Sequence, residues 1–88
     1  MEQILDEVLH EIKNTLINKN QEYGDSFHKT LEEYGLISVI IRLTDKLNRL
    51  KFLYQSGASA YDTLLDIAGY AILTLVEIKR KTNQERRY

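Results

Sequence analysis

The stretch from residue 61 to residue 78 is apolar over most of its length, with no proline and a single glycine. At about 100° per residue, apolar side chains would cover well over half of the circumference of a helix formed here. Such a helix must pack against neighbours on several sides. A chain of 88 residues is too short to supply all of those neighbours. We therefore expect an all-α fold, a small antiparallel helical bundle that is completed by homo-oligomerisation.

The same stretch also carries a narrow polar stripe. Asp62 and Asp66 lie one helical turn apart, in line with Gly69, and Tyr70 lies at the edge of the stripe. Two carboxylates at this spacing repel each other, and burying them without partners is costly. They form either an ordinary solvated stripe or a site that holds a cation, which could be a lysine, an arginine or a metal ion. The apolar surroundings and the gap at Gly69 favour a site.

Composition limits the possible partners. Twelve basic and 13 acidic residues give a net charge of −1, so we expect no stable binding of a nucleic-acid duplex. The chain has no cysteine, which excludes disulfides and thiolate metal sites. Acidic residues interrupt the N-terminus, so no signal peptide is expected there, and no apolar run is long enough to span a bilayer. These features predict a single cytoplasmic domain over residues 1–88 with no membrane partner.

Helical spacing of apolar residues predicts three main helices, at about residues 2–18, 32–55 and 60–80. Gly57 is expected to end the second helix, and the short turn after it predicts that the second and third helices pack antiparallel. The tail at residues 79–88 is basic, which suits the C-terminal end of a helix or a frayed solvated end.

Between the first two helices, asparagines, Gly24 and their polar neighbours predict a loop at residues 19–30. This loop has two interpretations. It is either a functional loop or a helix end followed by aromatic anchors into the core. In the first interpretation, Tyr23 and Phe27 form aromatic walls, and polar side chains reach a ligand, namely Lys19, Glu22 and Asp25.

The second helix carries a charged stripe between apolar borders, formed by Arg42, Asp45 and Arg49. Asp45 could pair with Arg49 across one turn. Alternatively, two arginines beside a carboxylate suit a phosphate site with a metal ligand in reach, to which Lys46 could add a donor. Antiparallel packing would bring Asp62 near Arg49 and Asp66 near Asp45, so the two charged stripes would face each other across a cleft.

Three blocks, at residues 19–27, 42–50 and 62–71, resemble in order and spacing the nucleotide modification associated domain 1 family. That family is similar to the MazG-like all-α nucleoside triphosphate pyrophosphohydrolases, and the resemblance covers about residues 15–78. It implies a helical bundle that assembles as a dimer or a tetramer. It also implies a magnesium-dependent hydrolase that converts a nucleoside triphosphate or its deoxy form to the monophosphate and pyrophosphate.

The resemblance also implies roles for the candidate residues. Asp45, Asp62 and Asp66 would be the catalytic residues that hold Mg²⁺, while Arg42, Lys46 and Arg49 would neutralise phosphate charge. Tyr23, Phe27 and Tyr70 would border the base, and Lys19, Glu22 and Asp25 would close over the nucleotide. The chain departs from the superfamily pattern in that Asp62 precedes Asp66 by four residues instead of three, and Arg42 stands where an acid is usual. A non-catalytic nucleotide-binding module linked to nucleotide or DNA modification is therefore the alternative.

Overall fold

The computed structural model describes residues 1–23 and 25–86, and of these it leaves out the side chains of residues 20–23 and 84–86. This part of the chain consists of four helices and contains no strand: α1 (Glu2–Tyr23), α2 (Ser26–Tyr34), α3 (Ile37–Ser56) and α4 (Tyr61–Arg86). The expected all-α class is confirmed. No helix within these residues is both long enough and apolar enough to cross a membrane.

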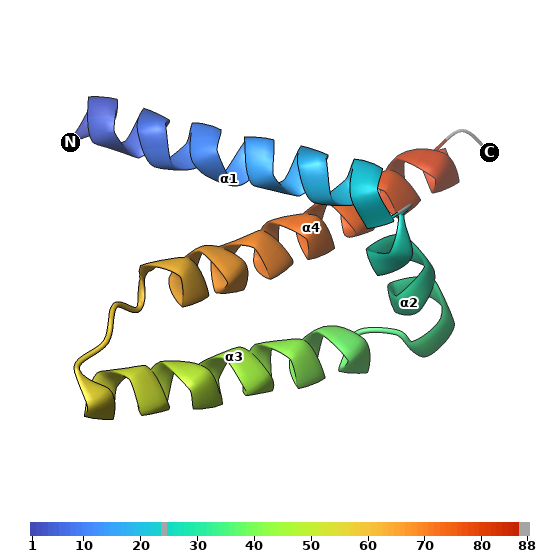
Figure 1. The fold of residues 1–88 in the computed structure, drawn as a ribbon. Coiled ribbons are helices and arrows are strands. Elements are labelled where there is room, and N and C mark those ends of the chain that lie inside the picture. The colour runs from blue at the N-terminus through green and yellow to red at the C-terminus, as the bar shows by residue number, and fades with distance from the viewer. Residues whose placement is uncertain (24, 87–88) are drawn as a thin grey trace.

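Helix α4 lies between α1 and α3 (Figure 1). Helices α3 and α4 run antiparallel, as the short turn predicts, and Gly57 ends α3 with a positive φ of 74°. Its N–H bonds to the carbonyl oxygens of Leu53 and Tyr54, as a glycine C-cap does. The short helix α2 packs against α3 and connects the end of α1 to the start of α3.

The structure differs from the expected helix bounds at both ends of α2. Residues 19–30 are mostly helical, because α1 continues to Tyr23 and α2 begins at Ser26. The expected helix at residues 32–55 is divided at Gly35, whose φ of 74° ends α2 and whose N–H bonds to the carbonyl oxygen of Leu31 at 2.8 Å. A glycine adopts this conformation without the steric cost that a Cβ brings. Helix α4 also extends past residue 80, so the basic tail is helical through residue 86.

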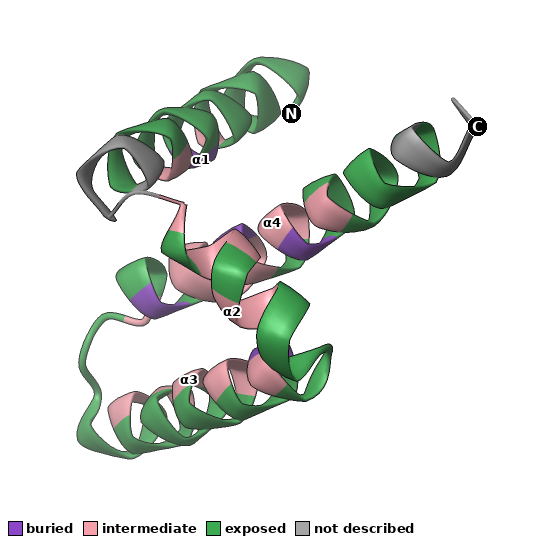
Figure 2. Cartoon of the chain, turned by 90° about the vertical axis from the view of Figure 1, so that its right-hand side faces the viewer, coloured by how far each residue is buried: buried purple, intermediate pink, exposed green. Residues whose placement is uncertain are grey.

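The apolar core is small. Among the described side chains, Ile12 and Val39 are the buried apolar residues, and Thr63 and Thr74 are buried as well (Figure 2). Large apolar side chains remain exposed on every helix, at Ile4, Leu5, Leu9 and Ile17 of α1, Tyr34 of α2, Ile37, Ile40, Ile41, Leu47, Phe52 and Tyr54 of α3, and Tyr61, Leu64, Leu75, Val76 and Ile78 of α4, and at Leu36 just before α3. Among the residues that the structure describes, none covers these side chains.

Helices α1 and α4 approach each other closely at Gly69. A Cβ added at this glycine would lie 3.3 Å from Leu16 Cδ2 of α1. Further along the same pair of helices, the Tyr61 hydroxyl donates a hydrogen bond of 2.7 Å to Glu11 Oε2. The missing side chain at position 69 therefore sets how closely the two helices pack.

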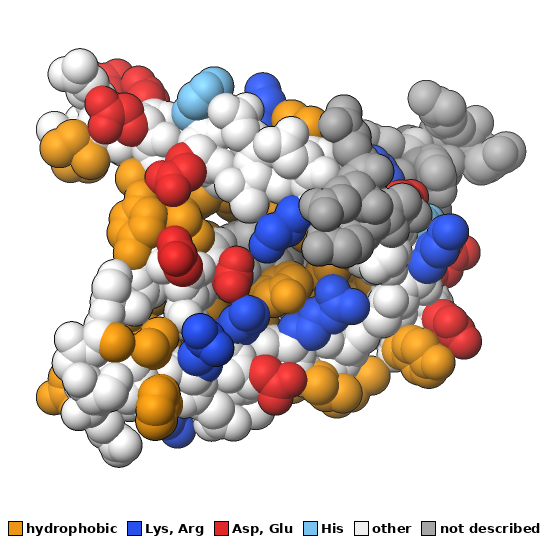
Figure 3. All heavy atoms as spheres, viewed as in Figure 1, with side chains coloured by type: hydrophobic (Ala, Val, Ile, Leu, Met, Phe, Trp, Pro, Cys, Tyr) orange, Lys and Arg blue, Asp and Glu red, His pale blue; other side chains and the backbone are white. Residues whose placement is uncertain are grey.

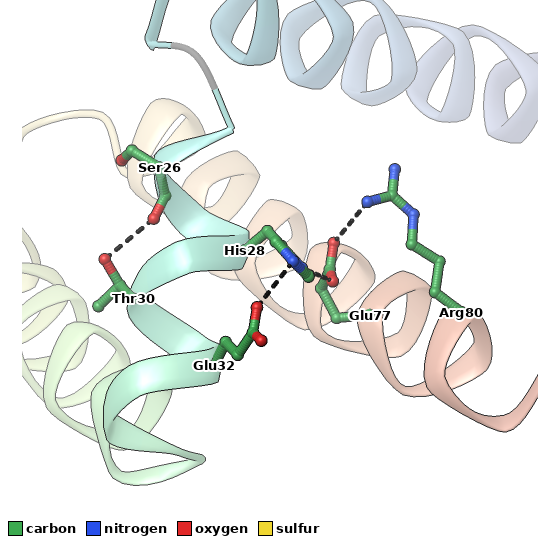
Figure 4. A network of polar contacts seen from close by, with 6 residues as sticks. All are labelled: Ser26, His28, Thr30, Glu32, Glu77 and Arg80. Carbon is green, nitrogen blue, oxygen red and sulfur yellow. Dashed lines mark hydrogen bonds and ion pairs between the residues drawn. The ribbon is translucent and has the colours of Figure 1, made fainter. Parts of the chain in front are cut away.

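A polar network ties α2 to the C-terminal half of α4 (Figure 4). The imidazole of His28 bonds through Nδ1 to Glu77 Oε2, and its Nε2 lies 3.0 Å from Glu32 Oε2. Arg80 pairs with the other oxygen of Glu77 at 3.2 Å. The hydrogen bond to Glu77, and then the charge of Glu77, raise the pKa of His28 above its usual value of 6.5. The network therefore holds α2 most firmly when His28 is protonated.

This network predicts a pH-dependent stability. Because the pKa of His28 is raised in the folded state, its contribution is complete below the unfolded value and is lost as pH rises through the folded value. The contribution should be under about 1 kcal/mol, because 38% of the imidazole is exposed. Urea unfolding at about pH 5.5 and about pH 9 should show that His28→Gln destabilises the protein only at the lower pH. The control is His10→Gln, which replaces an exposed histidine of α1. An equal loss of stability in His28→Gln at both pH values would contradict the role of His28.

Candidate functional site

All four helices contribute to one cavity of about 300 Å³. It lies where α4 meets α1 on one side and α2 and α3 on the other. On the face in Figure 3, basic side chains gather along the edge of α3 that faces α4. The residues that line it are Ile12, Thr15, Leu16, Lys19, Ser26, Phe27, Arg42, Leu65, Asp66, Gly69, Tyr70 and Leu73.

Two aromatic rings and one guanidinium form part of the cavity wall. The rings of Phe27 from α2 and Tyr70 from α4 are stacked, with centroids 6.3 Å apart and an angle of 19° between their planes. The Cζ atom of Arg42 lies 5.6 Å from the centroid of Phe27 and 5.7 Å from that of Tyr70. These distances allow cation–π attraction to both rings, which holds the arginine in place at the wall.

The carboxylate of Asp66 lies between two lysines in the same cavity region. Lys46 Nζ of α3 donates to Asp66 Oδ2 at 2.9 Å, and Lys19 Nζ of α1 lies 3.7 Å from Oδ1. The side chains of Asp66 and Lys46 are 32% and 28% exposed, so this pair is partly shielded from water. The cation that the acidic stripe of α4 requires is therefore supplied by lysine in this structure.

The two other candidate acids are not gathered with Asp66. Asp45 and Asp62 are exposed, and neither lines the cavity. Within the described part of the chain, no three histidine, aspartate or glutamate side chains form a group that could hold a metal ion. The binding of Mg²⁺ by these three aspartates stays a prediction.

The charged stripes of α3 and α4 do not pair through the residues that the sequence predicts. Arg49 is exposed, and none of the ion pairs among the described residues joins it to Asp62. Asp45 is exposed, whereas Asp66 pairs with Lys46 and Lys19. Lys46, the residue after Asp45, meets Asp66 instead. One residue turns a helix by about 100°, so a difference of one position decides which side chain faces the cleft.

One candidate from the expected loop lies outside the cavity. Asp25 has a positive φ of 65° before α2 and does not line the cavity. The side chains of Glu22 and Tyr23 lie outside the described residues. The hydroxyl-bearing Thr15 and Ser26 do line the cavity, although sequence reasoning assigned them no role. No local sequence signal marks them, because only the packing of α1 and α2 against α4 brings them there.

The cavity therefore combines flat aromatic surface, three cationic side chains in or beside it and a partly apolar lining. Such a combination suits a small ligand with a planar ring and an anionic group. Comparisons of the chain with protein-family models, with curated proteins and with solved structures gave no match.

Proposed function

We propose that this protein binds a nucleoside phosphate in the cavity between its four helices. The observation that carries the proposal is the arrangement of a stacked pair, Phe27 and Tyr70, beside Arg42 and close to the lysines that hold Asp66. Aromatic rings and aliphatic wall residues provide surface for a base, and the cations provide donors for phosphate oxygens. The resemblance of the sequence to nucleotide-handling helical proteins leads to the same class of ligand.

The size of the cavity supports a mononucleotide. Ligand pockets in proteins are usually about 300–1,000 Å³, so a volume of about 300 Å³ lies at the small end of that range. A nucleic-acid strand would need an extended basic surface, and the chain has a net charge of −1. A single nucleotide therefore suits this site better than a polymer.

A thermal-shift panel tests the proposal. Each deoxynucleoside mono- and triphosphate is added with and without Mg²⁺, beside the free nucleosides and inorganic pyrophosphate. A ligand that binds only the native state raises its stability by about 2.7 kcal/mol at a hundred times its Kd. We expect nucleotides to raise the melting temperature more than nucleosides or pyrophosphate do. No rise with any nucleotide would refute the proposal.

A matched pair of variants locates the binding. Tyr70→Leu removes a ring from the cavity wall, whereas Tyr34→Leu removes a tyrosine of α2 that is 63% exposed and does not line the cavity. Only Tyr70→Leu should reduce the shift caused by nucleotides. Equal reductions in both variants would place binding elsewhere.

Magnesium-dependent hydrolysis of a nucleoside triphosphate is the second candidate function. It is favoured by the carboxylate of Asp66, which lies in the cavity wall. Mg²⁺ is usually held by one or two carboxylates together with ligand phosphates, so a single carboxylate beside a bound nucleotide suits it. Bound there, the metal would neutralise phosphate charge. Release of pyrophosphate in the Mg²⁺ arm of the panel would support hydrolysis, and nucleotide binding without release would support a binding module.

We also propose that the protein acts as a homo-oligomer. The exposed side chains of Leu36, the N-cap of α3, and of Ile40 and Leu47 recur at helical spacing on one face, beside the buried Val39. Exposed apolar side chains also run along α1 and α4. A second copy of the chain has matching apolar faces, so association would remove both sets from water.

A further inference from the structure

We propose that Asp66 is the internal anion of the phosphate site, so that in the free protein its carboxylate holds Lys46 and Lys19 where the phosphate of the ligand binds. This inference rests on the proposed function and deepens it, because it names the side chains that the phosphate meets. When no metal is present, the carboxylate of Asp66 would thus compete with the phosphate of the ligand for the two lysines.

The geometry of three side chains carries the inference. Lys46 reaches Oδ2 of Asp66 at 2.9 Å, and Lys19 lies 3.7 Å from Oδ1. The two lysines come from different helices, α3 and α1, and each approaches a different oxygen of one carboxylate. A single anionic group therefore already bridges two cations beside a cavity that is open to a ligand.

A phosphate group is a stronger ligand for this pair of lysines than a carboxylate is. It offers more acceptor oxygens and carries more charge, and both properties strengthen hydrogen bonds from ammonium groups. The Lys19 side chain is also free to turn toward a new partner, because it is 55% exposed, and the ammonium group of each lysine has three rotatable donors.

The balance of charge at the site leads to the same conclusion. Arg42, Lys19 and Lys46 bring three positive charges, and Asp66 brings one negative charge, so the site has a surplus of two. That surplus matches a dianionic phosphate monoester. Removing the charge of Asp66 would raise the surplus to three and would free both lysines at once.

The test compares Asp66→Asn with Asp62→Asn. Both substitutions remove one negative charge from the same helix, but Asp62 is exposed and does not line the cavity. Titration calorimetry with the four deoxynucleoside monophosphates and with inorganic pyrophosphate, in buffer with a chelator, measures binding without metal. We expect Asp66→Asn to bind about tenfold more tightly than the wild type and Asp62→Asn to change binding less than about threefold.

A second pair of variants tests the lysine. Lys46→Gln removes the ammonium group that bonds to Asp66, and Lys51→Gln removes an exposed charge of the same helix. We expect only the first to weaken binding, by about tenfold, and we expect it to cancel the gain in the double variant with Asp66→Asn. Helical circular dichroism establishes that each variant is folded.

The outcomes separate this inference from the proposed function. If the wild type binds nucleotides while Asp66→Asn binds no more tightly than Asp62→Asn, the inference fails and the proposed function stands. If Asp66→Asn does not fold, the inference fails when Lys46→Gln behaves like Lys51→Gln. If neither the wild type nor any variant binds a nucleotide, the proposed function fails and this inference falls with it.

Discussion

Replacing Arg42 with methionine is expected to weaken nucleotide binding by about ten- to a hundredfold. The guanidinium is fixed over Phe27 and Tyr70, so it meets the ligand without losing much side-chain freedom on binding. A hydrogen bond to a charged group contributes about 1.5–3 kcal/mol, which gives this range of affinity. Methionine keeps the apolar stem and removes the donors. Titration calorimetry with the nucleotide that gives the largest thermal shift measures the change.

Arg49→Met is the matched control for Arg42→Met. The two arginines lie on α3, but Arg49 is exposed and does not line the cavity. Its substitution should change the affinity for nucleotide and the free energy of unfolding by less than about 0.5 kcal/mol each, as expected for an exposed surface position. A loss of affinity in Arg49→Met that equals the loss in Arg42→Met would show that phosphate is bound outside the cavity.

Light scattering at micromolar concentration is expected to give a particle of at least twice the chain mass of 10.3 kDa. In the isolated chain, only Ile12 and Val39 are buried among the described apolar side chains, which is too little for a stable monomer. Folding should therefore be coupled to association, and the melting temperature should fall as the protein is diluted. A folded particle of 10.3 kDa would contradict this expectation.

Two substitutions on α3 locate the surface that associates. Ile40→Glu places a charge among the exposed apolar side chains of α3, and burying an isoleucine side chain contributes about 1.5–3 kcal/mol. We expect it to weaken association by more than tenfold and to lower the melting temperature. Asn48→Glu adds the same charge at an exposed polar position of the helix and should have little effect. Equal effects of the two substitutions would move the interface away from Ile40.

The parts of the fold that were predictable from sequence follow from local signals. The apolar pattern of α3 and α4 and the glycine at position 57 predict an antiparallel pair, and the structure contains it. The break at Gly35 is not predictable from periodicity, because apolar residues continue on both sides of it and the pattern does not show whether the glycine keeps a helical conformation. Helix α2 is not predictable from the same pattern, because the polar residues and Gly24 that precede this helix of nine residues are typical of a loop.

The sequence predicts which residues belong to the candidate site better than it predicts which of them contact one another. Sequence reasoning named Arg42 and Arg49 as equivalent members of one stripe, and the structure separates them, because only the first lies near α2. It also placed Asp66 near Asp45, whereas the ion-pair partner of Asp66 on α3 is Lys46. Both differences depend on how far α3 is rotated about its own axis. Tertiary packing sets that rotation, and hydrophobic periodicity constrains it only within a broad face.

The close approach of α1 and α4 at Gly69 makes the width of the cavity depend on the spacing of these two helices. Position 69 lines the cavity, and a single methyl group there would press on the end of Leu16, which lines it too. Two chains that differ only by glycine or alanine at this position would thus offer the same polar groups in cavities of different width. Over evolutionary time, the width of this cavity could change through one codon, with every charged side chain of its wall left as it is.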